Sequence, residues 1–216
     1  GSRVAVGDGA STRSLILSDP DGERAIVTTG ESFRSLRLGE ATHGALAATE
    51  TVFLTGYTPD SVSRAVLDVV ASAPHPPALV FDLSGPVEEL VGRGTEPETI
   101  HRLLYAADLF VVGDVAAGAY FGGPGAALDR VAAVHRARAS EESAGADDGW
   151  PRAVLTHGAD GMTVVAAGDV TSFDAFEVDA MDSTGAGDAF VAGLIDRWVA
   201  PRDRGGSGDT PVGVAG

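Results

Sequence analysis

The chain has 216 residues, of which 44% are hydrophobic, and it contains no cysteine. This length and composition can bury a core of single-domain size, and the lack of cysteine excludes a disulfide framework or a thiolate metal site. Thirty-one acidic residues outnumber 15 basic ones, for a net charge of −16. Nucleic acids and anionic membranes would be repelled by so acidic a surface, so we expect neither as a partner and favour a small-molecule substrate.

All 15 basic residues are arginine, because the sequence contains no lysine. The P-loop nucleotide site and the protein kinase site both depend on a lysine, so both mechanisms are excluded. Phosphate charge must instead be met by arginine, by backbone N–H groups or by a metal ion. The absence of cysteine, of a membrane-span pattern and of a signal-peptide pattern at Gly1 leads us to expect a cytoplasmic protein.

The first part of the chain predicts a small antiparallel sheet. Strand-like stretches at residues 4–6, 15–17 and 24–29 are separated by turn-forming residues, among which Asp21-Gly22 is a hairpin signal. From residue 50 the pattern changes. Short apolar strands at 51–56, 78–83 and 109–113 then alternate with helical stretches at 61–73 and 97–107. This alternation predicts a parallel sheet with helical crossovers.

A further helix is predicted over residues 124–139, followed by a polar loop at 140–151. The strand pattern resumes at 153–158, and two β-rich runs between 162 and 173, joined by Gly168-Asp169, predict a second hairpin. A strand-like stretch containing Phe173, Phe176 and Val178 then leads to the most informative motif of the chain.

That motif is DSTGAGDAF at residues 182–190, directly before an apolar helical run. Backbone N–H groups at a helix N-terminus attract phosphate oxygens, and Gly185 and Gly187 allow a ligand to approach closely. Asp188 falls in the first helical turn, where its carboxylate can take a proton from an attacking alcohol. The motif therefore predicts phosphoryl transfer onto a hydroxyl group.

The run DSTGAGDAFVAGL closely resembles the C-terminal signature of the PfkB carbohydrate kinase family, the ribokinase-like sugar and nucleoside kinases. The stretches DGERAIVTT, FLTGYTPD, VFDLSGP and VLTHGADG resemble further landmarks, so the resemblance covers roughly residues 3–200. It implies an α/β, ribokinase-like fold with a mainly parallel, doubly wound sheet, helices on both faces and a small antiparallel β lid. We expect one domain over residues 1–216, with lid strands at 3–30 and without the family's N-terminal portion and C-terminal end.

By this resemblance, Asp188 is the base that deprotonates the acceptor hydroxyl. The implied anion hole is formed by the backbone N–H groups of Gly185, Ala186 and Gly187. The implied nucleotide-binding residues are Thr156, Gly158 and Gly161. A glycine-rich helix start with a capping aspartate, and a simple strand-ending turn, are the alternative interpretations of these two motifs.

Substrate contacts are expected from Arg24, Tyr57 and Asp82. Packing or turn roles are the alternatives for Tyr57 and Asp82, and an ordinary exposed strand arginine is the alternative for Arg24. Asp182 and Thr184 match positions that help bind a monovalent cation such as K⁺ in ribokinase-like enzymes, although they also fit an N-cap. The family's N-x-x-E pattern, which organises Mg²⁺, is replaced here by residues 113–116, Gly-Asp-Val-Ala. Asp114 is then the candidate for an offset Mg²⁺ ligand.

The resemblance implies an ATP-dependent, Mg²⁺-requiring kinase of a sugar or sugar-like substrate. The alternative is a catalytically weak sensor or assembly protein that binds a sugar or nucleotide, as the missing N-x-x-E pattern suggests. Pentose, hexose, keto-deoxy acid and nucleoside kinases share the C-terminal motif, so the substrate stays open. A sheet edge exposed by the missing N-terminal portion would favour a homodimer.

The acidic excess and the use of arginine alone predict adaptation to high salt, because carboxylates keep a protein hydrated while salt screens their repulsion. We expect the melting temperature of the chain to rise between low and molar KCl. Thermal melts across this range test the expectation. An unchanged or falling melting temperature would contradict it and leave codon bias as the explanation for the arginines.

Overall fold

The computed structural model describes residues 11–18, 24–30, 36–141, 151–166, 169–178 and 185–199. By their internal contacts the residues form two compact units, 1–127 and 128–216. The organisation of the chain as one domain stays a prediction. None of the helices in the described ranges has the length and apolar character that a membrane span needs.

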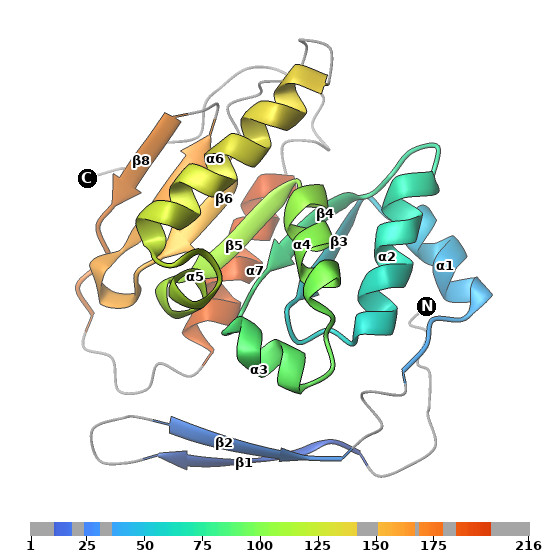
Figure 1. Cartoon of the computed structure of the whole chain (residues 1–216), viewed down its shortest axis with the longest axis horizontal. Coiled ribbons are helices and arrows are strands. Elements are labelled where there is room, and N and C mark those ends of the chain that lie inside the picture. Colours follow the sequence, from blue (N-terminus) through green and yellow to red (C-terminus); the bar gives the residue numbers. More distant parts are fainter. Residues whose placement is uncertain are drawn as a thin grey trace. The chain divides into compact units, whose positions relative to one another are not determined.

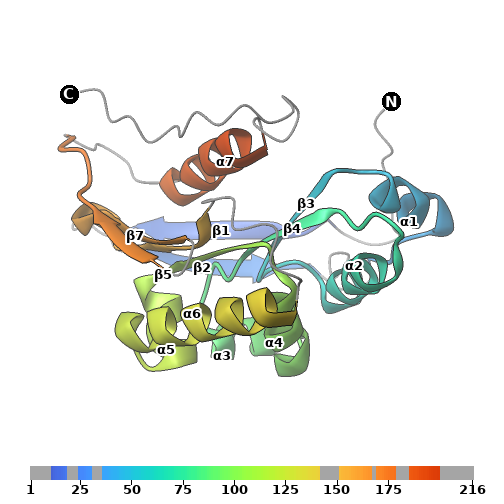
Figure 2. The same cartoon turned by 90° about the horizontal axis from the view of Figure 1, so that it is seen from above.

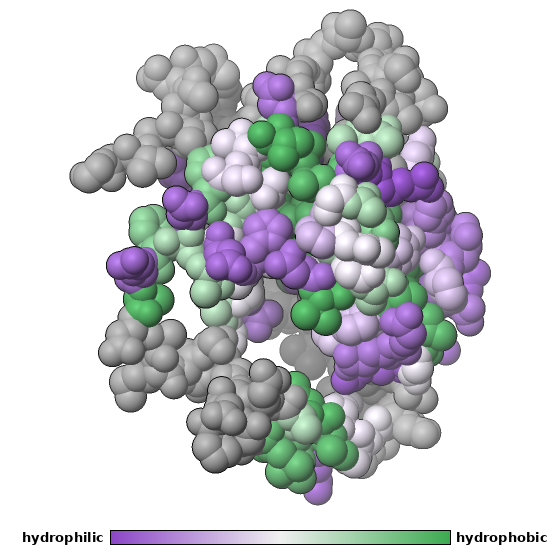
Figure 3. Space-filling model, turned by 60° about the vertical axis from the view of Figure 1, so that its left-hand side comes forward, coloured by the Kyte–Doolittle hydropathy of each residue, from purple (hydrophilic) through white to green (hydrophobic). Residues whose placement is uncertain are grey.

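An antiparallel hairpin is formed by β1 (Arg13–Ser18) and β2 (Arg24–Thr29), as the sequence predicts. Leu15 pairs with Val27 in its register. The expected strand at 4–6 and the Asp-Gly turn lie outside the described residues. Both faces of the hairpin carry apolar side chains that are more than half exposed, which gives it the green surface in Figure 3. These side chains are Leu15, Ile16, Leu17, Ile26 and Val27.

The first unit contains three parallel strands, β3 (Thr51–Thr55), β4 (Ala78–Asp82) and β5 (Leu109–Gly113), in that order across the sheet (Figure 1). The middle residues of β4 and almost all of β5 are buried, as is typical of strands covered on both faces. In β3, buried and exposed residues alternate. The predicted parallel strands are therefore confirmed.

The crossover helices α2 (Asp60–Ser72) and α4 (Pro97–Ala106) are also confirmed. Each buries residues three to four positions apart, such as Val62 and Val66 in α2, so one face of each helix joins the core. The helix predicted at 124–139 is confirmed as α6 (Pro124–Glu141). In Figure 2, α4 lies on the same side of the parallel strands as two helices that the sequence analysis missed, α3 and α5.

The helices missed from the sequence are α1 (Glu40–Ala47), α3 (Val87–Gly92) and α5 (Asp114–Phe121). Helix α1 buries none of its residues, so it carries no apolar stripe. Helix α3 has only six residues, which is too short for a periodic pattern. Helix α5 begins immediately after β5, without the loop that usually separates a strand from its helix.

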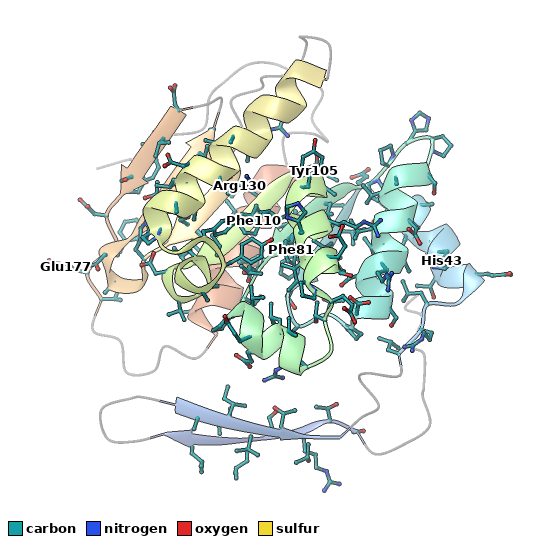
Figure 4. The ribbon with its side chains drawn as sticks, viewed as in Figure 1. His43, Phe81, Tyr105, Phe110, Arg130 and Glu177 are labelled. Carbon is teal, nitrogen blue, oxygen red and sulfur yellow. The ribbon has the colours of Figure 1, made fainter. Side chains whose placement is uncertain are left out.

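Aromatic rings fill the centre of the first unit. Phe81 of β4 and Phe110 of β5 lie side by side, with ring centroids 5.9 Å apart (Figure 4). Phe121, at the end of α5, packs edge-on against Phe110 at 6.3 Å. The C-terminal end of α5 is thereby anchored to β5.

The second unit contains three antiparallel strands, β6 (Pro151–Thr156), β7 (Met162–Ala166) and β8 (Asp169–Phe173), in that order. A single 3₁₀ turn, η1 (Gly158–Asp160), joins β6 to β7, and helix α7 spans Ala186–Val199. The predicted strand at 153–158 and the predicted hairpin are confirmed in the described residues.

The prediction of a strand over residues 173–178 is wrong beyond Phe173, where β8 ends. Phe173 pairs with Met162, the first residue of β7, so the following residues run past the end of their partner strand. Phe176 and Val178 are 90% and 75% exposed, and Glu177 points outward in Figure 4. The apolar pattern that predicted a strand here is therefore a run of exposed side chains.

Asp108, directly before β5, bonds to the backbone near the N-terminal end of β4. Its backbone N–H donates to the carbonyl of Leu79 at 2.8 Å, and its carboxylate Oδ2 accepts the N–H of Leu79 at 2.8 Å. Leu79 is fully buried, so its N–H has no access to water. The carboxylate therefore satisfies a backbone donor at the N-terminal end of β4.

Replacing this carboxylate should leave the N–H of Leu79 unsatisfied. We predict that Asp108→Ala lowers the free energy of unfolding by about 1–3 kcal/mol, measured by urea denaturation. Asp68→Ala is the matched control, because the Asp68 side chain is 77% exposed on α2. Equal effects of the two substitutions would contradict the assigned role of Asp108.

Candidate functional site

The carboxyl ends of the parallel strands bring two predicted site residues to one edge of the sheet. The ladder continues past β3 and β4, because the N–H of Gly56 donates to the carbonyl of Asp82 at 2.7 Å. A Cβ atom at Gly56 would collide with the carbonyl oxygen of Leu83 and lie 2.8 Å from the side chain of Leu90. Glycine at this position lets the two strand ends approach, and it places Tyr57 beside Asp82.

Tyr57 is held by α3. Its hydroxyl donates to Oε2 of Glu89 at 3.3 Å, and the guanidinium of Arg93 lies over its ring, 4.8 Å from the centroid. Arg93 also binds the Oε1 atom of Glu89, through a nitrogen at 2.7 Å. The three side chains therefore form one cluster, which we call the Tyr57–Glu89–Arg93 cluster.

Burial raises the pKa of Tyr57 above its ordinary value of 10.0. The negative charge of Glu89 and its hydrogen bond to the hydroxyl act in the same direction, and Asp82 adds a smaller effect. Only the charge of Arg93 opposes them. Tyr57 is therefore a neutral hydrogen-bond donor at physiological pH.

Asp82 organises a turn at the end of β4. Its Oδ1 accepts the N–H of Ser84 at 2.9 Å, and the Ser84 hydroxyl donates to the Asp82 carbonyl at 3.1 Å. Ser84 adopts the left-handed region with φ of 62°, which the aspartate's hydrogen bond supports. The turn role that the sequence left open for Asp82 is thus present in the structure.

A cavity of about 790 Å³ opens beside Tyr57 in the first unit. It is lined by α2, by Arg37 and His43 before and within α1, and by Arg93 and its neighbours between α3 and α4. Arg37 donates to the Ser61 hydroxyl at 3.0 Å, which orders the wall at the start of α2. The lining is mixed in charge, because Asp60 and Asp68 stand beside the arginines.

Sequence analysis missed Glu89, Arg93 and Arg37 as parts of this region. Arg93 lies four positions after Glu89, a spacing that favours an ion pair on a helix, so this pair carried a readable signal. Arg37 had none, since its partner Ser61 is 24 positions away along the chain. Arg24 begins β2 opposite Ser18, and its side chain lies outside the described part of the structure.

In the second unit, the predicted nucleotide residues form the turn after β6. Thr156 is the last residue of β6, and Gly158 begins η1 with a φ of 59°. Gly161 has a φ of 99°, and a Cβ atom there would collide with the Phe173 carbonyl oxygen and lie 2.8 Å from the backbone nitrogen of Ala175. Gly161 therefore has a structural reason to be glycine, independent of any ligand.

The start of α7 has the geometry that the motif predicts. Gly185 precedes the helix with a φ of 76°, and its carbonyl accepts the N–H of Ala189 at 2.8 Å. Ala186, Gly187 and Asp188 form the exposed first turn, whose N–H groups have no acceptor within the helix. Among the described residues, no atom lies within 4 Å of a Cβ atom built at Gly187. Asp182 and Thr184 lie outside the described residues.

The expected Mg²⁺ region follows β5. Asp114 is exposed at the first position of α5, whereas Ala116, at the position where the resemblance leads us to expect a glutamate, is only 3% exposed. In the described ranges, no group of three or more His, Asp or Glu side chains is arranged to hold a metal ion. The described side chains alone therefore do not build a Mg²⁺ site, and a role for Asp114 stays a prediction.

Solved structures with a similar fold include a sugar kinase, a ribokinase and a nucleoside kinase. A probable sugar kinase from Rhizobium etli CFN 42 superposes with a TM-score of 0.66 and 22% identity, over 88% of this chain and 54% of that one. Arabidopsis thaliana ribokinase complexed with ribose and ATP gives a TM-score of 0.59 and 18% identity, over 86% and 55%. A Burkholderia thailandensis nucleoside kinase in complex with inosine gives 0.58 and 21%, over 87% and 54%. The chain is therefore a ribokinase-like α/β protein.

A match to a protein-family pattern assigns the chain to one family within this fold. The chain belongs to the pfkB family of carbohydrate kinases, whose pattern matches residues 4–215. A fructokinase from Escherichia coli is 52% identical over 42 residues, which are 19% of this chain and 14% of that protein. The chain spans little more than half the length of the solved structures named above. The α/β, ribokinase-like fold expected from the sequence is confirmed.

The Tyr57–Glu89–Arg93 cluster has a measurable consequence. We predict that Tyr57 ionises above pH 10 and that Glu89→Gln moves its pKa back toward 10.0, because the carboxylate that raises it is removed. Since the pKa is raised in the folded chain, folding stability should fall as the pH rises above 10. The measurement is the ultraviolet absorbance titration, with Tyr57→Phe as the reference that isolates Tyr57 from the other two tyrosines. A Tyr57 that ionises at or below pH 10 in the unsubstituted chain would contradict the cluster.

Proposed function

We propose that this protein transfers the γ-phosphoryl group of ATP to a hydroxyl group of a sugar or sugar-like substrate. The observation that carries the proposal is the start of α7, where exposed backbone N–H groups and the Asp188 carboxylate share one helical turn. Membership of the pfkB carbohydrate kinase family supports the same reaction. ATP and ribose are named with the ribokinase of similar fold, and fructokinase is the name of the relative with a 42-residue match.

In the proposed reaction, Asp188 acts as the general base. Its carboxylate accepts the proton of the substrate hydroxyl while the hydroxyl oxygen bonds to the γ-phosphorus and the bond to the β-phosphate oxygen breaks. The products are the phosphorylated substrate and ADP, with the proton on Asp188. The Asp188 side chain is exposed in the first turn of α7, so a substrate hydroxyl can reach it.

We assign the stabilisation of the negative charge on the transferring phosphoryl group to the backbone N–H groups of Gly185, Ala186 and Gly187. These donors are fixed by the helix before substrate arrives, so they need no reorganisation during the reaction. No described atom near Gly187 explains why this residue is glycine. Close approach of a phosphate group would explain it, because a side chain there would narrow the space.

The nucleotide is assigned to the turn formed by Thr156, Gly158 and Gly161. Gly158 and the two residues after it are exposed, so their backbone is accessible to a ligand. The substrate is assigned to the edge that carries Tyr57 and Asp82, with Arg24 as a further contact. The cavity of about 790 Å³ beside Tyr57 has the size of a small-molecule site.

Mg²⁺ is part of the proposal as the ion that accompanies the phosphates of ATP and neutralises their charge. Because the described side chains do not build a site for it, no step of the reaction is assigned to a protein-held metal. K⁺ binding by Asp182 and Thr184 stays a prediction. The same holds for a homodimer, which the exposed apolar side chains of β1 and β2 would favour, and for a cytoplasmic location.

A second candidate function rests on Ala116. This residue is buried, and it stands where the resemblance to the family implies a glutamate that helps to organise Mg²⁺. The protein would then bind a sugar or nucleotide as a sensor or assembly component without turnover. Under this function, affinity for ATP would not increase when Mg²⁺ is added.

The kinase function predicts that Asp188→Asn abolishes turnover while ATP still binds. Loss of a general base should lower kcat by about 10²- to 10⁴-fold, since asparagine keeps the shape but accepts no proton. The measurement is ATP consumption in high KCl with Mg²⁺, against a panel of sugars, sugar acids and nucleosides. Asp196→Asn is the control, because Asp196 is exposed on the same helix and carries the same charge.

Retained turnover in Asp188→Asn would refute its role as the base. Absence of turnover in the unsubstituted, folded chain, together with ATP affinity that does not depend on Mg²⁺, would favour the non-catalytic binder. Turnover with one class of substrate would name the substrate class.

A further inference from the structure

His157 links the turn after β6 to the two strands beside it. Its Nε2 lies 2.8 Å from the hydroxyl oxygen of Thr163 in β7, and that oxygen lies 3.3 Å from the hydroxyl of Ser172 in β8. Thr163 is only 6% exposed. A row of three hydrogen-bonded side chains therefore runs from β8 through β7 to the turn after β6.

The three side chains His157, Thr163 and Ser172 can satisfy one another's hydrogen-bonding groups. A threonine hydroxyl donates one hydrogen bond and accepts others, so it can bridge the imidazole nitrogen and the serine hydroxyl at once. Because Thr163 is buried, its hydroxyl would incur a desolvation cost without such partners. The ring of His157 is therefore held in place by a group that itself needs the contact.

The backbone of His157 is fixed as well. Its N–H donates to the carbonyl of Gly161 at 2.9 Å, and its carbonyl accepts the N–H of Asp160 at 3.1 Å. Gly158 to Asp160 are exposed, and no described atom lies within 4 Å of a Cβ atom built at Gly158. Side-chain packing therefore contributes little to holding this part of the turn, which makes the anchored ring important.

We propose that His157 is a positioning residue for nucleotide binding, and this rests on the proposed kinase function. It lies between Thr156 and Gly158, whose groups are assigned to the nucleotide, and it holds their backbone through Thr163 and Ser172. Its Nε2 is directed to Thr163 in the sheet, so the role assigned to the ring is to hold the turn and not to contact ATP itself. The motif analysis assigned it no role, since the contact to Thr163 depends on the strand pairing.

Substitution of His157 by glutamine and by asparagine distinguishes the effect of losing the Nε2 hydrogen bond from the effect of losing the imidazole ring. Glutamine can place its amide close to where Nε2 lies, whereas asparagine reaches only as far as Nδ1. We expect His157→Asn to raise both the KM for ATP and the dissociation constant of ATP measured by calorimetry by about 3- to 10-fold. A loss of this size corresponds to the free energy of one hydrogen bond. His157→Gln should restore most of this loss, and kcat and the KM for the sugar should not change.

Thr163→Val removes the same hydrogen bond from the other side and should raise the KM for ATP to a similar extent. His75→Asn is the control for the substitution itself, because His75 is exposed in the first unit. Melting temperatures of all variants show whether any loss reflects unfolding.

ATP affinity that is unchanged in His157→Asn, with or without a lower melting temperature, would overturn the inference and leave His157 a structural residue. Equal losses in the asparagine and glutamine variants would also overturn it, because the Nε2 contact would then not matter. An unsubstituted chain that fails to bind ATP would refute the proposed function itself. The two failures are therefore distinguishable.

Discussion

The close approach of two backbones at the ends of β3 and β4 is the constraint on which the first unit depends. Gly56 has room for no side chain, because the carbonyl of Leu83 and the side chain of Leu90 occupy that space. This approach extends the parallel ladder by one hydrogen bond, from Gly56 to Asp82. Tyr57 and the turn at Asp82 consequently emerge at the same edge, and α3 can reach Tyr57 through Glu89. A larger residue at position 56 would separate all of these groups together.

A chain without lysine must manage phosphate charge in another way. In the ion pairs that the structure describes, Arg64, Arg93 and Arg102 each pair with a carboxylate of the same unit. Their charge is at least partly neutralised within the fold, and exposed pairs of this kind contribute little to stability. Backbone N–H groups at the start of α7 do not have this competition, since they have no acceptor within the helix. This division agrees with a fold in which anion binding is assigned to backbone and glycine.

Much of the fold could be read from local sequence, and the reasons are physical. Strands β4 and β5 are short apolar runs, and α2 and α4 carry apolar residues at helical spacing, so burial left a direct signal in each. The start of α7 was readable because glycine and aspartate at fixed spacing define a helix N-terminus. The partners of Tyr57 and of His157 were not readable, because they are set by which strands and helices pack together. Phe176 and Val178 led to the prediction of a strand that the structure does not have, because exposed apolar residues cannot be told from buried strand residues in the sequence.

In the turn that follows β4, the adjacent positions 84 and 85 are restricted for different reasons. Ser84 occupies the left-handed region that glycine and asparagine adopt more easily, and its own hydrogen bonds to Asp82 offset the strain. Exchange of Ser84 for glycine would relieve this strain and remove the hydrogen bond from the Ser84 hydroxyl, two effects of opposite sign. At Gly85, by contrast, a Cβ atom would lie 2.5 Å from the Tyr57 hydroxyl oxygen. Position 84 is therefore restricted by its backbone conformation, whereas a side chain at position 85 would displace the Tyr57 hydroxyl and with it the contact to Glu89.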